Sequence, residues 1–251
     1  MTDPFSLKHD QLLFPHIFLG NDVAGSSSIY VNRGNSNVSQ DEIIRNRHLA
    51  LKQINNRYSD LCILKQVHSD KVIIADKFFE FGCEPEADAI VTNKLDLPIA
   101  IVTADCVPIL MADYENKVIA VIHAGWRGAK SDLIANTIDS MQKIGAKLDN
   151  IVAVIGPCIL QRSYEVSEEF FQGFLEQDQE NKRFFIPSTK DNHYMFDLLS
   201  YSISRIERYL NKIHPLSIDT FSSNQLFSFR RSTLASLPYM GNNISIIVMN
   251  S

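Results

Sequence analysis

The chain has 251 residues, 45% of them hydrophobic, which is enough to bury the core of one large domain or two small ones. Its 24 lysines and arginines are outnumbered by 29 aspartates and glutamates, so the net charge of −5 provides no general attraction for nucleic acid or an anionic membrane. An anionic ligand must therefore be bound by a local group of cations.

The cysteines and the N-terminal sequence indicate the compartment. The four cysteines are widely spaced and include no Cys-x-x-Cys pair, which excludes a dense disulfide scaffold. The first 18 residues are interrupted by Asp3, Pro4 and Asp10 and contain no continuous apolar segment, which is typical of neither a signal peptide nor a membrane anchor. We therefore expect a cytoplasmic protein with reduced thiols.

The predicted strands are short apolar runs bounded by turn-forming residues. In chain order they cover residues 61–67, 87–93, 98–104, 117–122, 150–156 and 244–250. Several runs are apolar at consecutive positions, which is typical of strands that are covered on both faces.

The predicted helices lie between these strands. They begin at a capping box over Ser39–Glu42, after Gly128, near Ser167 and near Asp197. The second helix should stop at Gly145, and the apolar stripe of the fourth extends to Ile213. This alternation predicts an α/β fold and leaves the strand order open.

Chemically active side chains follow three of the predicted strands. His68 follows the run 61–67, Cys106 follows the run 98–104, and His123 follows the run 117–122. Ligands of open α/β sheets bind outside the carboxyl ends of the strands, so these residues are expected to form one site. Two imidazoles and a thiolate suit zinc, and three protein ligands leave a fourth position for water or substrate.

The same residues permit a site without metal. Cys106 would be the nucleophile of a cysteine hydrolase and His123 its base, with Asp105 or another acid orienting the histidine. Taken singly, such a histidine is more commonly structural and a buried free cysteine is more commonly a small hydrophobe. The residue spacing leaves these alternatives open.

A family resemblance rests on successive motifs of the chain. The segments KQVHSDKV, EADAIVTN, TADCVPIL, VIAVIHAGWRGA, and IGPCI followed by YEV resemble the YfiH/YlmD family. Its members have been described as multicopper polyphenol oxidases or laccase-domain proteins, and as zinc-dependent purine nucleoside phosphorylases. The resemblance extends from His16 to the segment FSFRR at 227–231. It implies a single α/β domain over residues 1–251, with mixed sheets in a sandwich flanked by helices.

The resemblance also implies a function. The family's metal ligands correspond to His68 of the QVH motif, Cys106 of TADC and His123 of HAGWRG. Its activities are phosphorolysis of adenosine, inosine and methylthioadenosine to base and ribose 1-phosphate, and deamination of adenosine. Purine nucleosides and phosphate would be the partners, and the oxidase description would require copper. A degenerate member that binds nucleosides without turnover is a further alternative.

Residues of the HAGWRG turn are candidates for binding the substrate. Arg127 is a candidate for phosphate, with a structural salt bridge or a carbonyl contact as the alternative. Gly125 and Gly128 permit a tight turn and an anion site at the following helix N-terminus. Trp126 would stack on a purine or simply pack in the core.

Acidic and basic residues elsewhere complete the candidate set. Asp88 and Asp105 flank the predicted site, where either would orient a ligand imidazole, move a proton or contact substrate. Arg230 and Arg231 form a positive pair that would contact phosphate or ribose, and Arg47 would reach the pocket from its helix. Cys158 is expected in the core rather than as a fourth ligand.

Two segments depart from the family pattern. Where the family commonly has Thr-Arg-x-Gly-Gly-Val-Ser, this chain reads GNDVAGS over residues 20–26. After Arg231 it reads STLAS over residues 232–236, in place of Asp-Gly-x-Thr-Gly-Arg. The substrate range or efficiency is expected to differ if either segment binds substrate.

Overall fold

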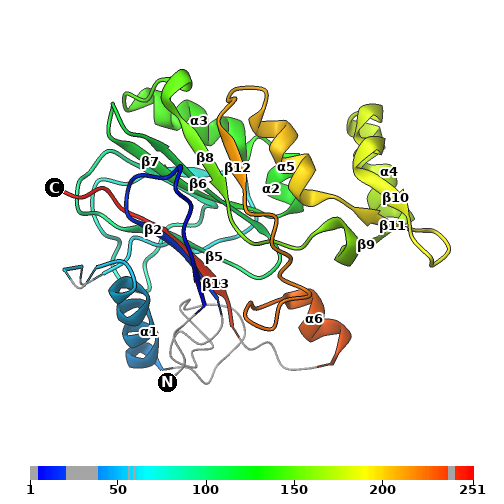
Figure 1. The fold of residues 1–251 in the computed structure, drawn as a ribbon, viewed down its shortest axis with the longest axis horizontal. Coiled ribbons are helices and arrows are strands. Elements are labelled where there is room, and N and C mark those ends of the chain that lie inside the picture. Colours follow the sequence, from blue (N-terminus) through cyan, green and yellow to red (C-terminus); the bar gives the residue numbers. More distant parts are fainter. Residues whose placement is uncertain (1–4, 21–38, 56, 59, 237–240) are drawn as a thin grey trace.

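Two β-sheets packed on each other form the centre of the computed structural model, which describes residues 5–20, 39–55, 57–58, 60–236 and 241–251 (Figure 1). The larger sheet has the strand order β12-β8-β6-β7-β4-β3 and the smaller one the order β1-β2-β13-β5. The larger sheet is mixed, because β3 runs parallel to β4 and β12 parallel to β8, whereas its other pairs are antiparallel.

The strands of the larger sheet are β3 (Val72–Ile74), β4 (Ala89–Thr92), β6 (Val107–Asp113), β7 (Val118–Ala124), β8 (Val152–Ile155) and β12 (Ile213–Pro215). The strands of the smaller sheet are β1 (Ser6–Leu7), β2 (His16–Leu19), β5 (Ile99–Thr103) and β13 (Asn243–Ile247). A third sheet, in the order β10-β11-β9, contains β9 (Glu165–Ser167), β10 (Phe185–Pro187) and β11 (His193–Phe196).

Helices flank the three sheets. They are α1 (Gln40–Lys52), α2 (Trp126–Lys130), α3 (Leu133–Lys143), α4 (Glu168–Gln177), α5 (Leu198–Ile206) and α6 (Phe229–Leu234). Helix α1 packs on the smaller sheet, α3 and α5 on the larger one, and α4 against the third sheet. No helix in the described ranges is long and apolar enough to cross a membrane.

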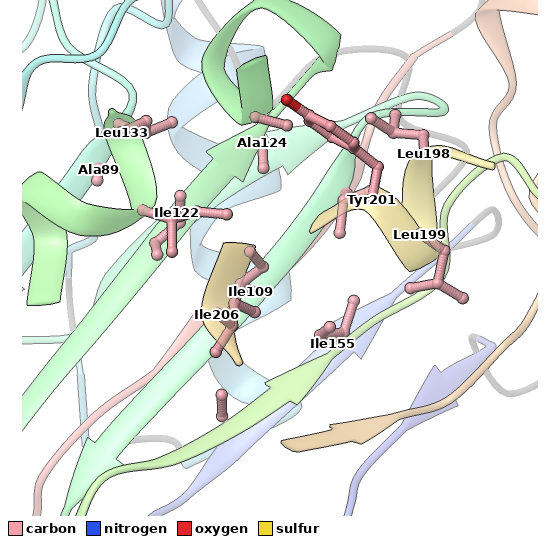
Figure 2. Close-up of a cluster of buried hydrophobic side chains, with 14 of the residues drawn as sticks. Ala89, Ile109, Ile122, Ala124, Leu133, Ile155, Leu198, Leu199, Tyr201 and Ile206 are labelled. Atoms are coloured by element: carbon pink, nitrogen blue, oxygen red, sulfur yellow. The ribbon is translucent and has the colours of Figure 1, made fainter. Parts of the chain in front are cut away.

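Burial on both faces explains the continuous apolar runs of the central strands. Successive side chains of a strand point to opposite faces, so Leu110 and Val121 lie between the two sheets while Ile109 and Ile122 face the helices. Figure 2 shows the second group, where Ile109 and Ile122 lie beside Ile206 of α5. The α/β sandwich flanked by helices that the family resemblance implied is confirmed.

The predicted helices and most predicted strands are present, but the run 61–67 is not a strand, and β1 to β3, β6 and β9 to β12 were not predicted. Residues 61–67 form only isolated bridges, because the Gln66 side chain bonds both the N–H and the C=O of Val102 in place of a continuous backbone ladder. Strand β6 was not predicted, since Pro108 interrupts its apolar run. Pro108 lacks an N–H donor, but its carbonyl still accepts a hydrogen bond from the Gly156 N–H at 2.9 Å.

The helix predictions were closer. Ser39 caps α1 by accepting a hydrogen bond from the Glu42 N–H at 3.2 Å, and Ser167 caps α4. Helix α5 ends at Ile206, so the predicted stripe is too long, and Ile213 begins β12 instead. The atypical segment 20–26 lies outside the described residues, except for its first glycine.

The buried His16 in β2 makes stability depend on pH. Its Nδ1 donates to the Phe14 carbonyl and its Nε2 accepts from the His9 N–H, both at 2.9 Å, which requires a neutral ring. Burial, reinforced by the nearby charges of Lys8 and His9, lowers the pKa of His16 below 6.5. Its contribution to stability is therefore fully present above pH 6.5 and is lost as the pH falls toward the folded-state pKa.

We predict that His16→Gln, which retains a donor and an acceptor without titrating, flattens this dependence. Denaturant unfolding between pH 7 and 5, at about half-unit steps, measures it, and wild type should lose more stability than the variant. Parallel curves for the two proteins would contradict the assignment.

Candidate metal centre and ligand cavity

The register of the larger sheet brings the predicted ligands together. Strand β7 pairs with β6 so that His123 lies opposite Pro108, which places Cys106 just beyond this pair. On its other side β7 pairs with β4 so that Ile122 lies opposite Ala89, and the His123 N–H donates to the Asp88 carbonyl at 2.8 Å. His123 thus lies within β7, near its end, and not after it.

His68, Cys106 and His123 converge on one point. Their potential ligand atoms all lie within 4.8 Å of one another, and Cys106 Sγ is 3.8 Å from His68 Nε2. The imidazole ring centres are 4.7 Å apart and the rings are nearly perpendicular. The spacing of sulfur and nitrogen is near the roughly 3.5 Å expected for two ligands of a tetrahedral zinc ion.

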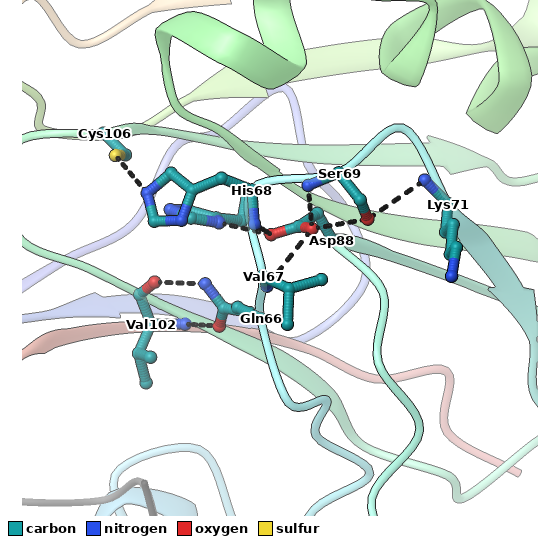
Figure 3. Close-up of polar contacts among 9 residues, drawn as sticks. Gln66, Val67, His68, Ser69, Lys71, Asp88, Val102 and Cys106 are labelled. Carbon is teal, nitrogen blue, oxygen red and sulfur yellow. Dashed lines mark hydrogen bonds and ion pairs between the residues drawn. The ribbon is translucent and has the colours of Figure 1, made fainter. Parts of the chain in front are cut away.

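The buried carboxylate of Asp88 positions two of these three residues (Figure 3). It accepts hydrogen bonds from the backbone N–H groups of Val67, His68 and Ser69, and from the Ser69 hydroxyl. It also bonds His123 Nδ1 at 2.8 Å, which leaves Nε2 of that ring to face the site. His68 has the left-handed φ of 60°, a conformation that costs about 1–2 kcal/mol and that these bonds hold in place.

A glycine leaves the space that the ligands occupy. The φ of Gly125 is −68°, which any residue adopts, so its backbone does not require glycine. A Cβ at this position would instead lie 2.9 Å from His68 Cδ2 and 3.0 Å from Cys106 Sγ. The absence of a side chain at Gly125 therefore allows His68 and Cys106 to approach each other.

Charge interactions favour the ligand form of the cysteine. Burial raises the pKa of the Cys106 thiol, but His123 and His68 outweigh it and lower the pKa overall. Burial likewise lowers the pKa of His123, while the Cys106 thiolate and Asp88 outweigh it and raise the pKa. Burial opposes ionisation of Asp88 as well, yet the hydrogen bonds from His123 and Ser69 lower its pKa to about 2.

The types and positions of the donor atoms fit a metal ion. A thiolate and two imidazoles are the donor set of zinc or copper sites, and a carboxylate bonded to the far nitrogen of a ligand histidine is typical of zinc sites. With three protein ligands, a fourth position would face the adjoining cavity. The arrangement therefore has the form of a catalytic metal centre.

A cavity of about 610 Å³ opens beside the candidate ligands, within the usual range for small-molecule sites. Besides His68, Cys106 and His123, the described lining residues are Gln66, Val102, Thr103, Ala104, Asp105, Trp126, Arg127, Ile159, Tyr164, Leu198, Phe229, Arg230, Thr233, Leu234 and Asn242. They come from both central sheets, from α2, α5 and α6, and from the loops between them.

Two of the predicted arginines lie in this cavity, each over an aromatic ring. The guanidinium carbon of Arg127 is 4.3 Å from the ring centre of Trp126, and that of Arg230 is 5.3 Å from the ring centre of Tyr164. Within the part of the chain that the structure describes, neither guanidinium pairs with a carboxylate. Both are therefore available to bind an anion.

Trp126 satisfies both interpretations of its role. Its ring packs against Phe170, with 5.0 Å between the centres, and against Phe174. Another part of the residue lines the cavity. The anion site expected at the N-terminus of the following helix is weak, since α2 is a single turn of five residues.

Asp105 lines the cavity but contacts neither imidazole. Its carboxylate accepts a hydrogen bond from the Thr220 hydroxyl at 2.6 Å and from the Arg230 N–H at 2.7 Å. The structure therefore contradicts the expectation that Asp105 orients His123. Asp105 holds the first turn of α6 against the cavity instead.

Two further predicted arginines lie outside the cavity lining. The Arg47 side chain pairs with Glu84 at 2.8 Å and lies 4.9 Å from the ring centre of Phe81. The Arg231 guanidinium donates to four backbone carbonyls, those of Thr220, Phe221, Ser223 and Leu226. Arg231 thus stabilises a loop, and any contact between substrate and Arg47 or Arg231 stays a prediction. Cys158 is buried in the core.

Sequence reasoning assigned no role to several residues at the cavity. Gln66 and Tyr164 belong to the motifs KQVHSDKV and YEV, so their place within motifs was the available signal. The atypical segment 232–236 begins within α6 and brings Thr233 and Leu234 to the cavity. No periodicity in this polar segment indicated that contact.

The fold and site define a mixed α/β domain with a three-ligand centre beside an arginine-containing cavity. The family model described as multi-copper polyphenol oxidoreductase laccase matches residues 23–250, and the chain belongs to this family.

Sequence relatives carry two different names. A purine nucleoside phosphorylase of Rickettsia conorii is 40% identical over 228 residues, 89% of this chain and 91% of that protein. A protein named adenosine deaminase RL5, from an unknown prokaryotic organism, is 38% identical over 122 residues, 46% of this chain and 47% of that protein.

Solved structures show the same fold. A Neisseria meningitidis protein superposes with a TM-score of 0.81 and 22% identity, covering 100% of both chains. YfiH of Bacillus licheniformis gives a TM-score of 0.80 with 22% identity, covering 94% of this chain and 92% of that one. Together with the match to the family model, this shared fold confirms the resemblance to the YfiH/YlmD family.

We predict that Asp88→Asn weakens the binding of added Zn²⁺ by about 10- to 100-fold, because His123 loses its carboxylate partner and residues 67–69 lose an acceptor. Competition with a chromophoric chelator measures the affinity. Asp113→Asn is the matched control, since Asp113 is equally buried but bonds Asn116 and Lys147. Unchanged zinc affinity in folded Asp88→Asn would contradict the positioning role.

Proposed function

We propose that this protein is a zinc-dependent purine nucleoside phosphorylase. The observation that carries the proposal is that one cavity combines the His68, Cys106 and His123 centre with the guanidinium groups of Arg127 and Arg230. The name of the Rickettsia conorii relative, which matches along most of both chains, supports the same activity. Adenosine, inosine and methylthioadenosine are the proposed substrates.

The two arginines are the proposed phosphate site. A guanidinium binds phosphate through charge-assisted hydrogen bonds in a fixed fork. Stacking of Arg127 on Trp126 and of Arg230 on Tyr164 limits the freedom of both side chains before phosphate binds. Since the whole chain has a net charge of −5, this local pair supplies the attraction for the anion.

The aromatic residues of the cavity are the proposed site for the purine. Trp126, Tyr164 and Phe229 come from different segments of the chain and line one space. Such rings bind a planar base by stacking, which is tolerant of substituents on the base. Phe229 is 59% exposed, so a bound base would remove part of its surface from water.

The proposed reaction exchanges one bond at C1′ of the ribose. A phosphate oxygen forms a bond to C1′, the bond from C1′ to the purine nitrogen breaks, and its electron pair leaves with the base. Arg127 and Arg230 orient the phosphate and stabilise its charge as it approaches the positive ribose. A zinc ion bound by the three ligands would supply Lewis acidity. Asp88 keeps His123 in the tautomer that such a ligand needs.

We propose deamination of adenosine as a second activity. Likeness to the protein named adenosine deaminase RL5 supports it, over slightly less than half of either chain. The balanced reaction adds water at C6 of adenine and releases ammonia. The same cavity would hold the base for this reaction.

A cysteine hydrolase is the alternative function that needs no metal, but its acid differs from the one expected. Asp88, not Asp105, bonds His123, so a catalytic triad would contain Cys106, His123 and Asp88. A copper-dependent oxidase would use the same three ligands with a different metal. Binding of a nucleoside without turnover would use only the cavity.

A product assay distinguishes these functions. Protein purified without a His tag and analysed for zinc and copper would be incubated with adenosine, inosine and methylthioadenosine, with and without phosphate. Free base together with a ribose 1-phosphate, formed only with phosphate, is the expected result for zinc-containing protein. Free base without phosphate dependence, phenol oxidation with copper, or ligand-induced thermal stabilisation without product would each favour another function.

Replacement of Cys106 by Ala should abolish zinc retention and phosphorolysis together, because a three-ligand centre loses its thiolate. Metal analysis and the product assay are applied to the same preparation. Cys83→Ala is the matched control, since this cysteine is exposed and outside the site. Full activity of Cys106→Ala would rule out the zinc proposal.

We predict that Arg127→Gln and Arg230→Gln each raise the KM for phosphate by about 10- to 100-fold, the equivalent of one charge-assisted hydrogen bond. Initial rates at varied phosphate and saturating inosine measure the effect. Arg205→Gln is the control, because Arg205 pairs with Asp132 outside the cavity. An unchanged KM for phosphate in both cavity variants would place the anion elsewhere.

A further inference from the structure

Tyr164 lines the cavity, contacts Arg230 and contributes its ring to the proposed purine site, but its hydroxyl has no role so far. Its ring is fixed by packing against Phe170 and Phe196, with centres 6.2 and 5.7 Å away. Its backbone carbonyl accepts a hydrogen bond from the Phe196 N–H at 2.9 Å. The residue is therefore held rigidly at the cavity wall.

The hydroxyl of Tyr164 is available to a ligand. It makes no hydrogen bond with any residue in the described ranges, and it is not among the fully buried polar atoms that lack a partner. A tyrosine in such packed surroundings normally places its hydroxyl against a polar partner. A ligand bound in the cavity would supply the hydrogen-bond partner of this hydroxyl.

Three other uncharged polar side chains of the cavity wall, those of Gln66, Thr103 and Thr233, are engaged or inaccessible. The amide of Gln66 bonds both backbone groups of Val102 at 2.8 Å. The hydroxyl of Thr233 donates to the Phe229 carbonyl, and the Thr103 hydroxyl is buried beneath the surface. Among these groups, the phenol is the one able to give a proton to a substrate.

Charged residues near the phenol act on its acidity in both directions. Burial and the Cys106 thiolate raise the pKa of Tyr164, so the hydroxyl carries its proton in the absence of a substrate. Arg230 and Arg127 act in the opposite direction and stabilise the phenolate that donation would leave. The Asp105 carboxylate is an acceptor already occupied by Thr220 and by a backbone N–H.

A purine leaving group needs such a donor. When the bond between C1′ and the base breaks, its electron pair raises the basicity of the purine, and a proton on a ring nitrogen prevents a free purine anion from forming. The guanidinium groups of Arg127 and Arg230 are already assigned to the phosphate in the proposed reaction.

We propose that Tyr164 is a catalytic residue whose O–H protonates the departing purine, an inference that rests on the proposed phosphorolysis. The proton moves from the phenol oxygen to a ring nitrogen as the glycosidic electron pair moves onto the base. Phosphate forms its bond to C1′ on the sugar, and the phenolate then recovers a proton from water. The bonds and charges balance without a further reactant.

Tyr164→Phe tests this role, because it removes only the hydroxyl and keeps the ring contacts. We compare inosine with 7-methylinosine, whose base is already cationic and leaves without a proton. The variant should lose about 10²- to 10⁴-fold in kcat on inosine, as expected for a general acid, and less than tenfold on 7-methylinosine. Zinc content should be unchanged. Tyr209→Phe is the matched control, since Tyr209 is 40% exposed and outside the cavity.

An equal loss on both substrates, or full activity on inosine, would overturn the role of Tyr164. If wild type releases ribose 1-phosphate from neither substrate, the proposed function has failed instead. Should wild type turn over inosine but reject 7-methylinosine, nicotinamide riboside replaces it, because its base also leaves without a proton. The loss of kcat in Tyr164→Phe on inosine is then compared with its loss on nicotinamide riboside, and a larger loss on inosine supports the role of Tyr164.

Discussion

The buried carboxylate of Asp88 is the interaction on which the site depends. It bonds the backbone of residues 67–69 and the imidazole of His123, and so joins a loop to the central strand β7. Removing an ionised, fully hydrogen-bonded group from the interior would leave several donors without an acceptor. One side chain therefore fixes the strained backbone of His68, the tautomer of His123 and the separation of the two rings.

The two sheets supply the rest of the geometry. The link of residues 104–106 crosses from β5 in the smaller sheet to β6 in the larger one, so Cys106 lies where the sheets meet. The pairing of β6 with β7 then brings it to His123. Cavity residues attached to this rigid frame come from α2, α5 and α6, so the phosphate and purine subsites are held relative to the metal centre.

The sequence predicts the framework better than the cavity. Continuous apolar runs identified the central strands other than β6, and capping serines identified α1 and α4, because burial and capping are local consequences of residue type. Cys106 and His123 were found since each lies near a strand end, and His68 because it follows an apolar run, although that run forms only isolated bridges. The sequence does not predict whether Asp88 or Asp105 bonds His123, because this depends on the register of β4 and β7. Tyr164 and α6 reach the cavity through long-range packing that no periodicity encodes.

X-ray absorption at the metal edge tests the central claim most directly, because it reports the ligands of the ion without depending on a substrate. The sample is the full chain purified without a tag, and Cys106→Ala is the reference. The account predicts a zinc edge with one sulfur at about 2.3 Å and two imidazole nitrogens at about 2.0 Å. A protein without bound metal, or a metal shell without sulfur, would contradict the three-ligand centre.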